Sequence, residues 1–306
     1  MTPESTPPPS SAGVDPLPPT SLIIPSRNRP EILTETVASV LGGEEVPAEL
    51  IIIDQSDGAH PELAHLTSTR GCAIRYVWSQ VPGVSRARNQ GIDLASHEVI
   101  AFTDDDVFVT PTWFGTLVRA LVAAGPKAVV TGQVRPAEEH DGGFVPSTMV
   151  DPNPTVYRGR IWADVLYPPN MAAYASQFAH VGRFDLHLGA GEDNDLAYRL
   201  LEAGYGIHYV PDAVVYHRAW RTNREYLPLK WRYGFGQGMF YAKHAGIRDR
   251  YMLWRLIHDV RVRGARGLRL ATSNRRRAMG QFVCIAGQVT GFAKGLVARA
   301  SRPVAR

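Results

Sequence analysis

Short, continuously apolar runs alternate with segments of helical periodicity over the first two thirds of the chain. The apolar runs occupy residues 22–24, 50–53, 99–102, 128–131 and 213–216, and each has the length of a buried strand. Apolar side chains recur at helical spacing over residues 31–41, 114–122 and 196–203. Strands that are apolar throughout are typical of a parallel sheet covered on both faces. The pattern therefore predicts an α/β fold with a mostly parallel central sheet flanked by helices.

Polar residues cluster directly after three of these strands, at residues 25–28, 54–57 and 104–106. In an open α/β sheet the ligand crevice lies at the carboxyl ends of the strands. A nucleotide-type site is therefore expected there. The first strand is not followed by a Gly-x-x-x-x-Gly-Lys-Ser/Thr loop or by a Gly-x-Gly-x-x-Gly turn. Kinase-like and dinucleotide-binding proteins are therefore not indicated.

Length and composition suit one large domain, alone or with an appendage. The chain has 306 residues, of which 44% are apolar and 20% charged, as in ordinary globular proteins. Cys72 and Cys284 match no metal-ligand spacing, so neither a disulfide framework nor a zinc site is expected. Sparse cysteine fits a reducing cytoplasm. Residues 1–19, rich in Pro, Ser and Thr, are expected to form a disordered leader without a secretory signal.

The charge of the chain is divided unevenly. Residues 1–217 contain 13 Lys and Arg against 26 Asp and Glu, whereas residues 218–306 contain 20 against 3. An acidic front part joined to a basic tail indicates two roles in one chain. A basic tail recruits anions such as phospholipid headgroups, nucleic acid or a phosphorylated substrate. The alternative is a solvated helical face without a partner.

Three adjacent aspartates, Asp104 to Asp106, follow the strand at 99–102. Like charges this close raise one another's pKa unless a cation neutralises them. A hard divalent ion is the natural partner, and Mg²⁺ is commonly held by one or two carboxylates plus substrate phosphates. A solvated acidic turn is the alternative. His217, at the end of the strand at 213–216, either caps the core or completes the metal shell, and as a ligand it would favour Mn²⁺.

A second acidic cluster, Glu192 to Asp195, lies between Gly191 and the helix predicted from residue 196. Asp195 has the position of a helix cap, because acidic residues favour the positive end of the helix dipole. The Glu192–Asp193 pair follows glycine, whose flexible backbone lets a carboxylate project into a cleft. One of this pair is therefore a candidate base for activating a hydroxyl group.

Six segments in order resemble family 2 glycosyltransferases of the GT-A fold. The matching segments are residues 21–30, 51–58, 83–91, 100–106, 169–172 and 191–200. Their order and spacing agree over residues 21–217, about two thirds of the chain. The resemblance implies a metal-dependent inverting enzyme. It would move a sugar from a nucleotide diphospho-sugar to a hydroxyl acceptor, either a saccharide or a lipid-linked saccharide of the cell envelope.

Carried over by position, the resemblance assigns roles to single residues. Asp193 would be the base, and Glu192 would orient the acceptor hydroxyl. Asp106 would bind the metal, Mn²⁺ or Mg²⁺, which His217 would also ligate if it completes the metal shell, and Asp104 and Asp105 would help to hold metal and ribose. The residues that would contact the nucleotide-sugar are Pro25, Arg27, Asp54, Gln55, Arg88, Asp104 and Asp105. Gln55 stands where the family often has an acidic residue, so the donor base stays open. The Gly- and Pro-rich segment 140–170 would order over the site.

The expected organisation is the leader 1–19, a catalytic domain at 20–218 and a basic, mainly helical extension at 219–306. Aromatic and basic residues interleave over 220–241, and Arg275 to Arg277 precede an apolar stretch at 278–300. That stretch is expected to lie at a membrane interface, to pack on the catalytic domain or to span a membrane. We expect a cytoplasmic protein in peripheral contact with anionic lipid at the inner face of the plasma membrane.

Three other functions fit the sequence less well. A nucleotidyltransferase also uses aspartates and a metal, but normally has a Gly-rich loop with a lysine after the first strand, which residues 25–30 lack. A non-catalytic GT-A-like binding protein is disfavoured by the joint presence of Asp106, Asp193 and His217. A nucleic-acid-binding protein is supported only by the tail. No nucleic-acid partner is therefore expected.

Overall fold

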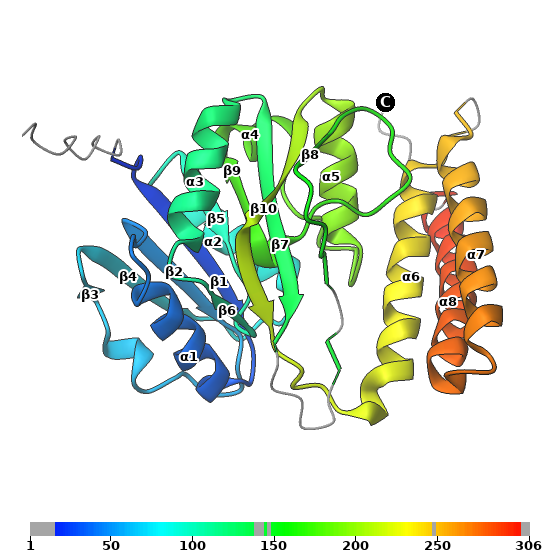
Figure 1. The fold of residues 1–306 in the computed structure, drawn as a ribbon, viewed down its shortest axis with the longest axis horizontal. Coiled ribbons are helices and arrows are strands. Elements are labelled where there is room, and N and C mark those ends of the chain that lie inside the picture. Colours follow the sequence, from blue (N-terminus) through cyan, green and yellow to red (C-terminus); the bar gives the residue numbers. More distant parts are fainter. Residues whose placement is uncertain (1–15, 138–143, 146–147, 247–248, 301–306) are drawn as a thin grey trace, which may run out of the picture.

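The computed structural model describes residues 16–137, 144–145, 148–246 and 249–300. Figure 1 shows a twisted sheet with helices on both faces and a group of three helices beside it. Most of the expected leader, residues 1–15, lies outside the described residues. Residues 16–19 lead into the first strand without regular structure.

Ten strands form one sheet within the described residues, in the order β3-β4-β2-β1-β5-β9-β7-β10-β6, with β8 also paired to β10. They are β1 (Thr20–Ser26), β2 (Glu49–Asp54), β3 (Ser68–Thr69), β4 (Cys72–Trp78), β5 (Val99–Phe102), β6 (Val107–Val109), β7 (Ala128–Pro136), β8 (Thr155–Tyr157), β9 (Met171–Tyr174) and β10 (Gly206–His217). The long ladders β4-β2-β1-β5 and β7-β10 are parallel. β9 joins these two groups by pairing antiparallel to both β5 and β7.

Eight helices surround or adjoin the sheet in the same part of the chain. They are α1 (Pro30–Leu41), α2 (Val84–Leu94), α3 (Trp113–Ala124), α4 (Ala175–Val181), α5 (Glu192–Glu202), α6 (Tyr226–His244), α7 (Tyr251–Leu270) and α8 (Arg275–Ala300). The sequence did not predict α2, because its segment is polar and only a narrow face, including Ala87 and Ile92, is buried. The predicted α/β fold and the helical C-terminal extension are confirmed.

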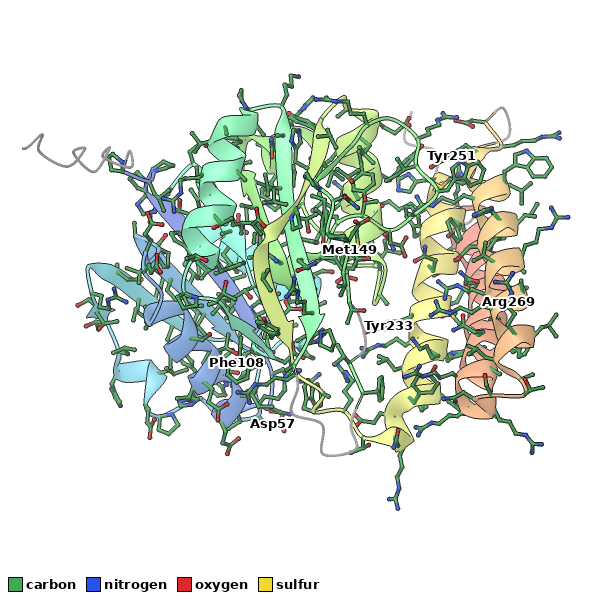
Figure 2. All side chains as sticks on the ribbon, viewed as in Figure 1. Asp57, Phe108, Met149, Tyr233, Tyr251 and Arg269 are labelled. Carbon is green, nitrogen blue, oxygen red and sulfur yellow. The ribbon has the colours of Figure 1, made fainter. Side chains whose placement is uncertain are left out.

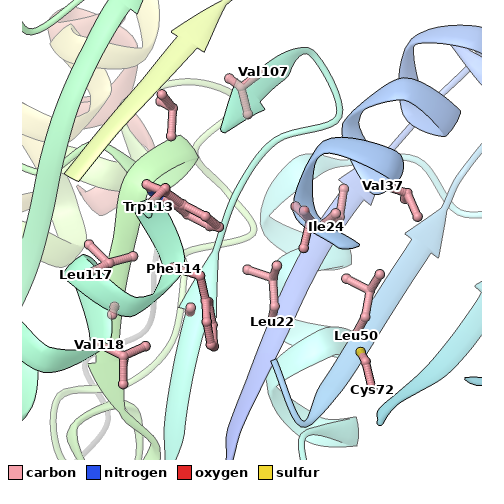
Figure 3. Packing of buried hydrophobic residues seen from close by; sticks show 14 of the residues in the cluster. Leu22, Ile24, Val37, Leu50, Cys72, Val107, Trp113, Phe114, Leu117 and Val118 are labelled. Atoms are coloured by element: carbon pink, nitrogen blue, oxygen red, sulfur yellow. The ribbon is translucent and has the colours of Figure 1, made fainter. Parts of the chain in front are cut away.

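The two faces of the sheet carry separate cores. Leu22 and Ile24 of β1 pack with α1 and α3 on one face, as Figure 3 shows. Ile23, between them, packs with α2, α4 and α5 on the other face. Successive side chains of a strand point to opposite faces, so a strand covered on both sides must be apolar at every position. This explains why the predicted strands have no polar alternation.

The extension packs on the catalytic part through α5 and α6. Asn194 of α5 donates a hydrogen bond to Gln237 of α6 at 2.9 Å, and Asp195 of α5 is bound by His244 of α6 at 2.6 Å. α8 in turn lies against α6 and α7. The apolar stretch at 278–300 therefore packs on one side against the other two helices of the extension, whereas the packing expected for it was on the catalytic domain.

Candidate functional site

The polar clusters after β1, β2 and β5 meet at one edge of the sheet. β1 runs parallel to β2 and β5, so the carboxyl ends of the three strands lie side by side. A cleft of about 650 Å³ opens there. The predicted site residues that line this cleft are Pro25, Arg27, Gln55, Arg88, Asp104, Asp105, Asp106, Glu192, Asp193 and His217. The structure thus brings together side chains separated by up to two thirds of the chain.

Asp54 differs, since it is not part of the described lining of the cleft. Its buried carboxylate accepts hydrogen bonds from the Tyr76 hydroxyl at 2.6 Å and from the Ser56 backbone N–H at 3.0 Å. Burial, together with this carboxylate, raises the pKa of Tyr76 to about 12. Asp54 therefore fixes the end of β2, while its neighbour Gln55 faces the cleft.

The first two of the three adjacent aspartates have separate cationic partners. Asp104 is bound by Arg88 at 2.8 Å. Asp105 is fully buried and accepts hydrogen bonds from the Ser26 hydroxyl at 2.7 Å and from Arg29. Burial raises the pKa of Asp105, and the charge of Arg29 offsets only part of this effect. Arg29 lies in the first matching segment but was not predicted as a site residue.

Asp106, the third aspartate, has an arginine, a tryptophan and a histidine as partners. Its carboxylate accepts hydrogen bonds from Arg29 at 2.8 Å and from the Trp220 indole N–H at 2.7 Å. His217 Nε2 lies 3.4 Å from its Oδ1. Burial alone would raise the pKa of Asp106, but the attraction of His217, followed by that of Arg29, holds it well below its usual range. Asp106 therefore stays ionised in a buried position beside a histidine.

This pair suits a divalent cation whose shell is completed by a substrate. Asp106 and His217 offer one oxygen and one nitrogen ligand next to each other. Within the described residues, no group of three or more His, Cys, Asp or Glu could hold a metal by itself. Mg²⁺ and similar ions commonly take one or two protein ligands plus phosphate oxygens. The donor set therefore fits a cation that binds together with a diphosphate.

The second acidic cluster stands on the first turn of α5 rather than on a flexible loop. Gly191 precedes the helix in a left-handed conformation, with φ +79°, which other residues adopt only with strain. A Cβ there would also reach the backbone of Gly236 in α6, at 3.4 Å. Gly191 thus lets α5 begin close against α6 and directs Glu192 and Asp193 into the cleft.

Arg88 bridges the two acidic clusters by ion pairs. It is 3% exposed and binds Asp104 at 2.8 Å and Glu192 at 3.0 Å. Asp193 makes no ion pair within the described part of the chain. Burial, reinforced by the negative charges of Glu192 and Asp164, raises the pKa of Asp193 to about 8. A carboxyl group with this pKa can take up a proton near neutral pH.

The C-terminal helices form the wall of the cleft opposite the strand ends. This helical wall comprises Lys230, Arg232, Tyr233 and Gln237 of α6, Arg263 of α7 and Cys284 of α8. Tyr233 lies on the side of α6 that faces the sheet (Figure 2). The sequence did not predict these residues as part of the site, because no local pattern links a distant helix to the strand ends.

The segment 140–170 contributes to the cleft through Asp164 and residues 166–169. Asp164 accepts hydrogen bonds from Arg255 at 3.1 Å and from Gln237 at 3.3 Å. Residues 138–143 and 146–147 of this region lie outside the described residues. The expected ordering of the segment over the site therefore stays a prediction.

Comparisons with known proteins agree with the resemblance seen in the sequence. The family model "Glycosyl transferase family 2" matches residues 21–179, more than half of the chain. The pre-mycofactocin glycosyltransferase of Mycobacterium tuberculosis H37Rv is 26% identical over 234 residues, which cover 73% of this chain and 48% of that protein. The chain thus spans about half the length of this relative. The glycosyltransferase AglE of Haloferax volcanii is 26% identical, with 72% of this chain and 73% of that protein covered.

Solved structures show the same fold. The mannosyltransferase PcManGT from Pyrobaculum calidifontis, in complex with GDP-Man and Mn²⁺, has a TM-score of 0.64 at 18% identity, covering 92% of this chain and 88% of that one. GalNAc-T7 with UDP, GalNAc and Mn²⁺ has a TM-score of 0.57 at 18% identity, covering 75% and 51%. The predicted GT-A fold is thereby confirmed.

Proposed function

Because the chain belongs to glycosyltransferase family 2 and is therefore a sugar-transferring enzyme, we propose that it uses a nucleotide diphospho-sugar and inverts the anomeric carbon. One observation carries this proposal. A single cleft contains both the aspartates that follow β5 and the ionisable Asp193 with its raised pKa. An inverting displacement requires a charged leaving group and a base on opposite faces of the anomeric carbon.

The donor is proposed to occupy the strand-end side of the cleft. Pro25, Arg27 and Gln55 would contact the nucleoside, and Asp104 and Asp105 would lie near the ribose and diphosphate. Asp106 and His217 would hold Mn²⁺ or Mg²⁺, which when bound offsets the negative charge on the departing diphosphate. Arg88 forms ion pairs with Asp104 and Glu192, so its proposed role is to position both carboxylates.

Asp193 is proposed to act as the base. The acceptor oxygen forms a bond to the anomeric carbon while the bond from that carbon to the diphosphate oxygen breaks. The electron pair leaves with the nucleoside diphosphate, and the hydroxyl proton passes to an Asp193 carboxylate oxygen. Attack from the face opposite the leaving group inverts the carbon. Glu192, fixed by Arg88 at 3.0 Å, would orient the acceptor hydroxyl.

The acceptor is proposed to be a saccharide or lipid-linked saccharide of the cell envelope, reached from the cytoplasmic face of the plasma membrane. By length and composition alone, Arg275–Arg299 could cross a membrane, although 33% of its most apolar window is buried inside the protein. α8 also exposes Met279, Phe282 and Val289 to solvent. With Arg275 and Arg277 exposed at its start, this outer face supports peripheral membrane contact.

Thermal stability measured against UDP-, GDP-, dTDP- and CDP-sugars, with Mn²⁺, Mg²⁺ or EDTA, tests the donor site. A ligand that binds only the native state raises the melting temperature. We expect a metal-dependent rise with one nucleotide family, lost in Asp106→Ala but kept in Asp212→Ala, a control at an exposed aspartate of β10. If no nucleotide raised the melting temperature of the wild type, the proposed function would be wrong.

A further inference from the structure

The two walls of the cleft carry opposite charge. Asp104, Asp105, Asp106, Glu192 and Asp193 gather on the sheet side. The helical wall presents Lys230 and Arg232 from α6 and Arg263 from α7, and Arg221 lines the cleft just before α6. A metal–diphosphate unit would bind near Asp106. The positive charge on the helical wall therefore indicates a second anionic ligand.

The charge of Lys230 is not neutralised by any carboxylate in the part of the chain that the structure describes. Its Nζ lies 5.4 Å from the ring centre of Tyr226 and 6.0 Å from that of Tyr233. Arg263 lies nearby and binds Asp259 at 3.2 Å. That carboxylate also accepts hydrogen bonds from Gln288 and Tyr241. A half-buried, uncompensated cation costs free energy unless an anion joins it.

Lys230 lies apart from the position proposed for the donor phosphates. Arg221 lies over the ring of Trp220, whose indole N–H binds Asp106 at the proposed diphosphate position. Lys230 lies instead beside the rings of Tyr226 and Tyr233, on the helical wall. Hydrogen bonds link Asp259, the ion-pair partner of Arg263, through Tyr241 and Gln237 to Asn194, the neighbour of the proposed base Asp193. Lys230 and Arg263 therefore lie on the side of the cleft from which an acceptor would approach the base.

We infer that Lys230 and Arg263 form an anion subsite for the acceptor, so that the acceptor carries a phosphate group close to the hydroxyl that receives the sugar. This inference rests on the proposed function, since it assigns the acceptor side of the same cleft. Lysine binds phosphate as a point charge, and arginine adds directed N–H donors. The phosphate can belong to a soluble sugar phosphate or to a lipid phosphate, because the subsite recognises the anion.

Calorimetric titration of inorganic phosphate into the full-length protein tests this subsite. The protein is first saturated with the nucleotide and metal selected by the thermal-stability panel. Phosphate should still bind, because the two anions occupy separate positions. Its Kd should rise about tenfold or more in Lys230→Gln, as expected for a lost charged hydrogen bond, and should recover in Lys230→Arg. Arg269→Gln, on the exposed surface of α7, is the matched control and should bind phosphate like the wild type.

The outcomes separate this inference from the proposed function. Phosphate that competes with the nucleotide, or whose Kd is unchanged in Lys230→Gln, would overturn the anion subsite while leaving sugar transfer intact. Absence of nucleotide binding in the panel would overturn the proposed function instead. A second titration compares glucose 6-phosphate with phosphatidylcholine vesicles containing an isoprenyl phosphate. Binding of one of these two ligands that depends on Lys230 would support the subsite and identify the source of the phosphate.

Discussion

At the scale of single residues, neighbouring carboxylates of the same type have opposite properties. Asp193 and Asp195 both lie in the first turn of α5, two positions apart. The pKa of Asp193 is raised by burial and by nearby carboxylates, whereas Asp195 is surrounded by cations. Their environments therefore favour proton transfer at one position and a permanent charge at the other.

Asp193→Asn should lower turnover by about 10²–10⁴-fold, because the hydroxyl proton loses its acceptor. Nucleotide binding should persist, since Asp193 is not among the proposed metal or nucleotide ligands. In the wild type, turnover should rise with pH and level off above about pH 8, where Asp193 becomes ionised. Transfer assays across this pH range check the prediction, with Asp212→Asn as a control at an exposed aspartate.

The same variant should be more heat-stable than the wild type. The folded-state pKa of Asp193 is raised, so the folded protein loses stability as pH rises from about 4 to about 8, a loss that the neutral asparagine avoids. In a domain of this size each kcal/mol gained corresponds to about 2–4 °C in Tm. Normal turnover in Asp193→Asn would rule out the role of base, whatever its Tm.

Asp195→Asn should destabilise the protein. Asp195 is fully buried and is bound by Lys243 and His244 at 2.6 Å and by Arg199 at 2.9 Å. Burial alone would raise the pKa of Asp195, but these partners, His244 foremost, lower it to about 2. Breaking a buried pair costs about 3–5 kcal/mol. In Asp195→Asn the three cations can regain contact with solvent, so we expect the unfolding free energy to fall by about 2–3 kcal/mol.

Chemical denaturation at several pH values measures this effect. A lowered folded-state pKa contributes stability that is present above about pH 4 and disappears as pH falls towards 2. The difference between wild type and Asp195→Asn should therefore shrink over that window. Asp249→Asn, in an exposed pair with Arg160, is the control and should leave the unfolding free energy nearly unchanged. A constant difference at every pH would mean that charge is not the cause.

At the scale of elements, glycines set the distance between α6 and α8. Each helix places glycines against the other's backbone: a Cβ at Gly234 would overlap the carbonyl of Cys284, and one at Gly291 that of Phe235. Small residues that permit close backbone approach are typical of helix pairs in membranes. The glycines in residues 278–300 are thus packing residues of the contact between α8 and α6.

Gly291→Val should push α6 and α8 apart and lower the unfolding free energy by about 1–3 kcal/mol, the usual cost of overpacking. Gly264→Ala is the matched control in α7. No atom lies within 4 Å of a Cβ there, and alanine favours helix by about 0.5–1 kcal/mol over glycine. Thermal melts should therefore move in opposite directions for the two variants. Equal Tm for Gly291→Val and wild type would show that the helices are not closely packed.

At the scale of the whole molecule, the basic extension has two sides. One side forms the helical wall of the cleft, and the other exposes apolar and basic side chains, among them Trp254 and Leu268 of α7. This arrangement supports the proposed membrane-bound acceptor, because the part of the chain that completes the site also exposes an apolar and basic surface.

Arg275→Ala/Arg277→Ala should weaken binding to vesicles rich in anionic lipid. Each basic residue near such a surface contributes about 1 kcal/mol, so the double variant should bind about 30-fold more weakly. Vesicle sedimentation measures the effect, with Lys127→Ala/Arg158→Ala as the control on exposed residues of the catalytic part. Release by high salt is expected for peripheral contact. Retention in salt until detergent is added would contradict it and favour a spanning helix.

The sequence by itself determined five of the strands, three of the helices that cover them, the fold family and ten of the residues that line the cleft. Hydrophobic periodicity and strand-end polar clusters are local properties, and in a parallel sheet the ends of neighbouring strands must meet. Asp104 to Asp106 and the end of β1 could therefore be placed together without coordinates.

Only the tertiary structure decided which partner each charged group received. Arg29 reaches Asp105 and Asp106 across 76 and 77 positions, and Arg88 reaches Glu192 across 104. Asp54 is bound by Tyr76 rather than facing the cleft. The C-terminal helices close the far wall and bring Lys230 into the site. These contacts depend on how distant elements pack, and the pKa of each carboxylate depends on those contacts, so no local pattern along the chain contains them.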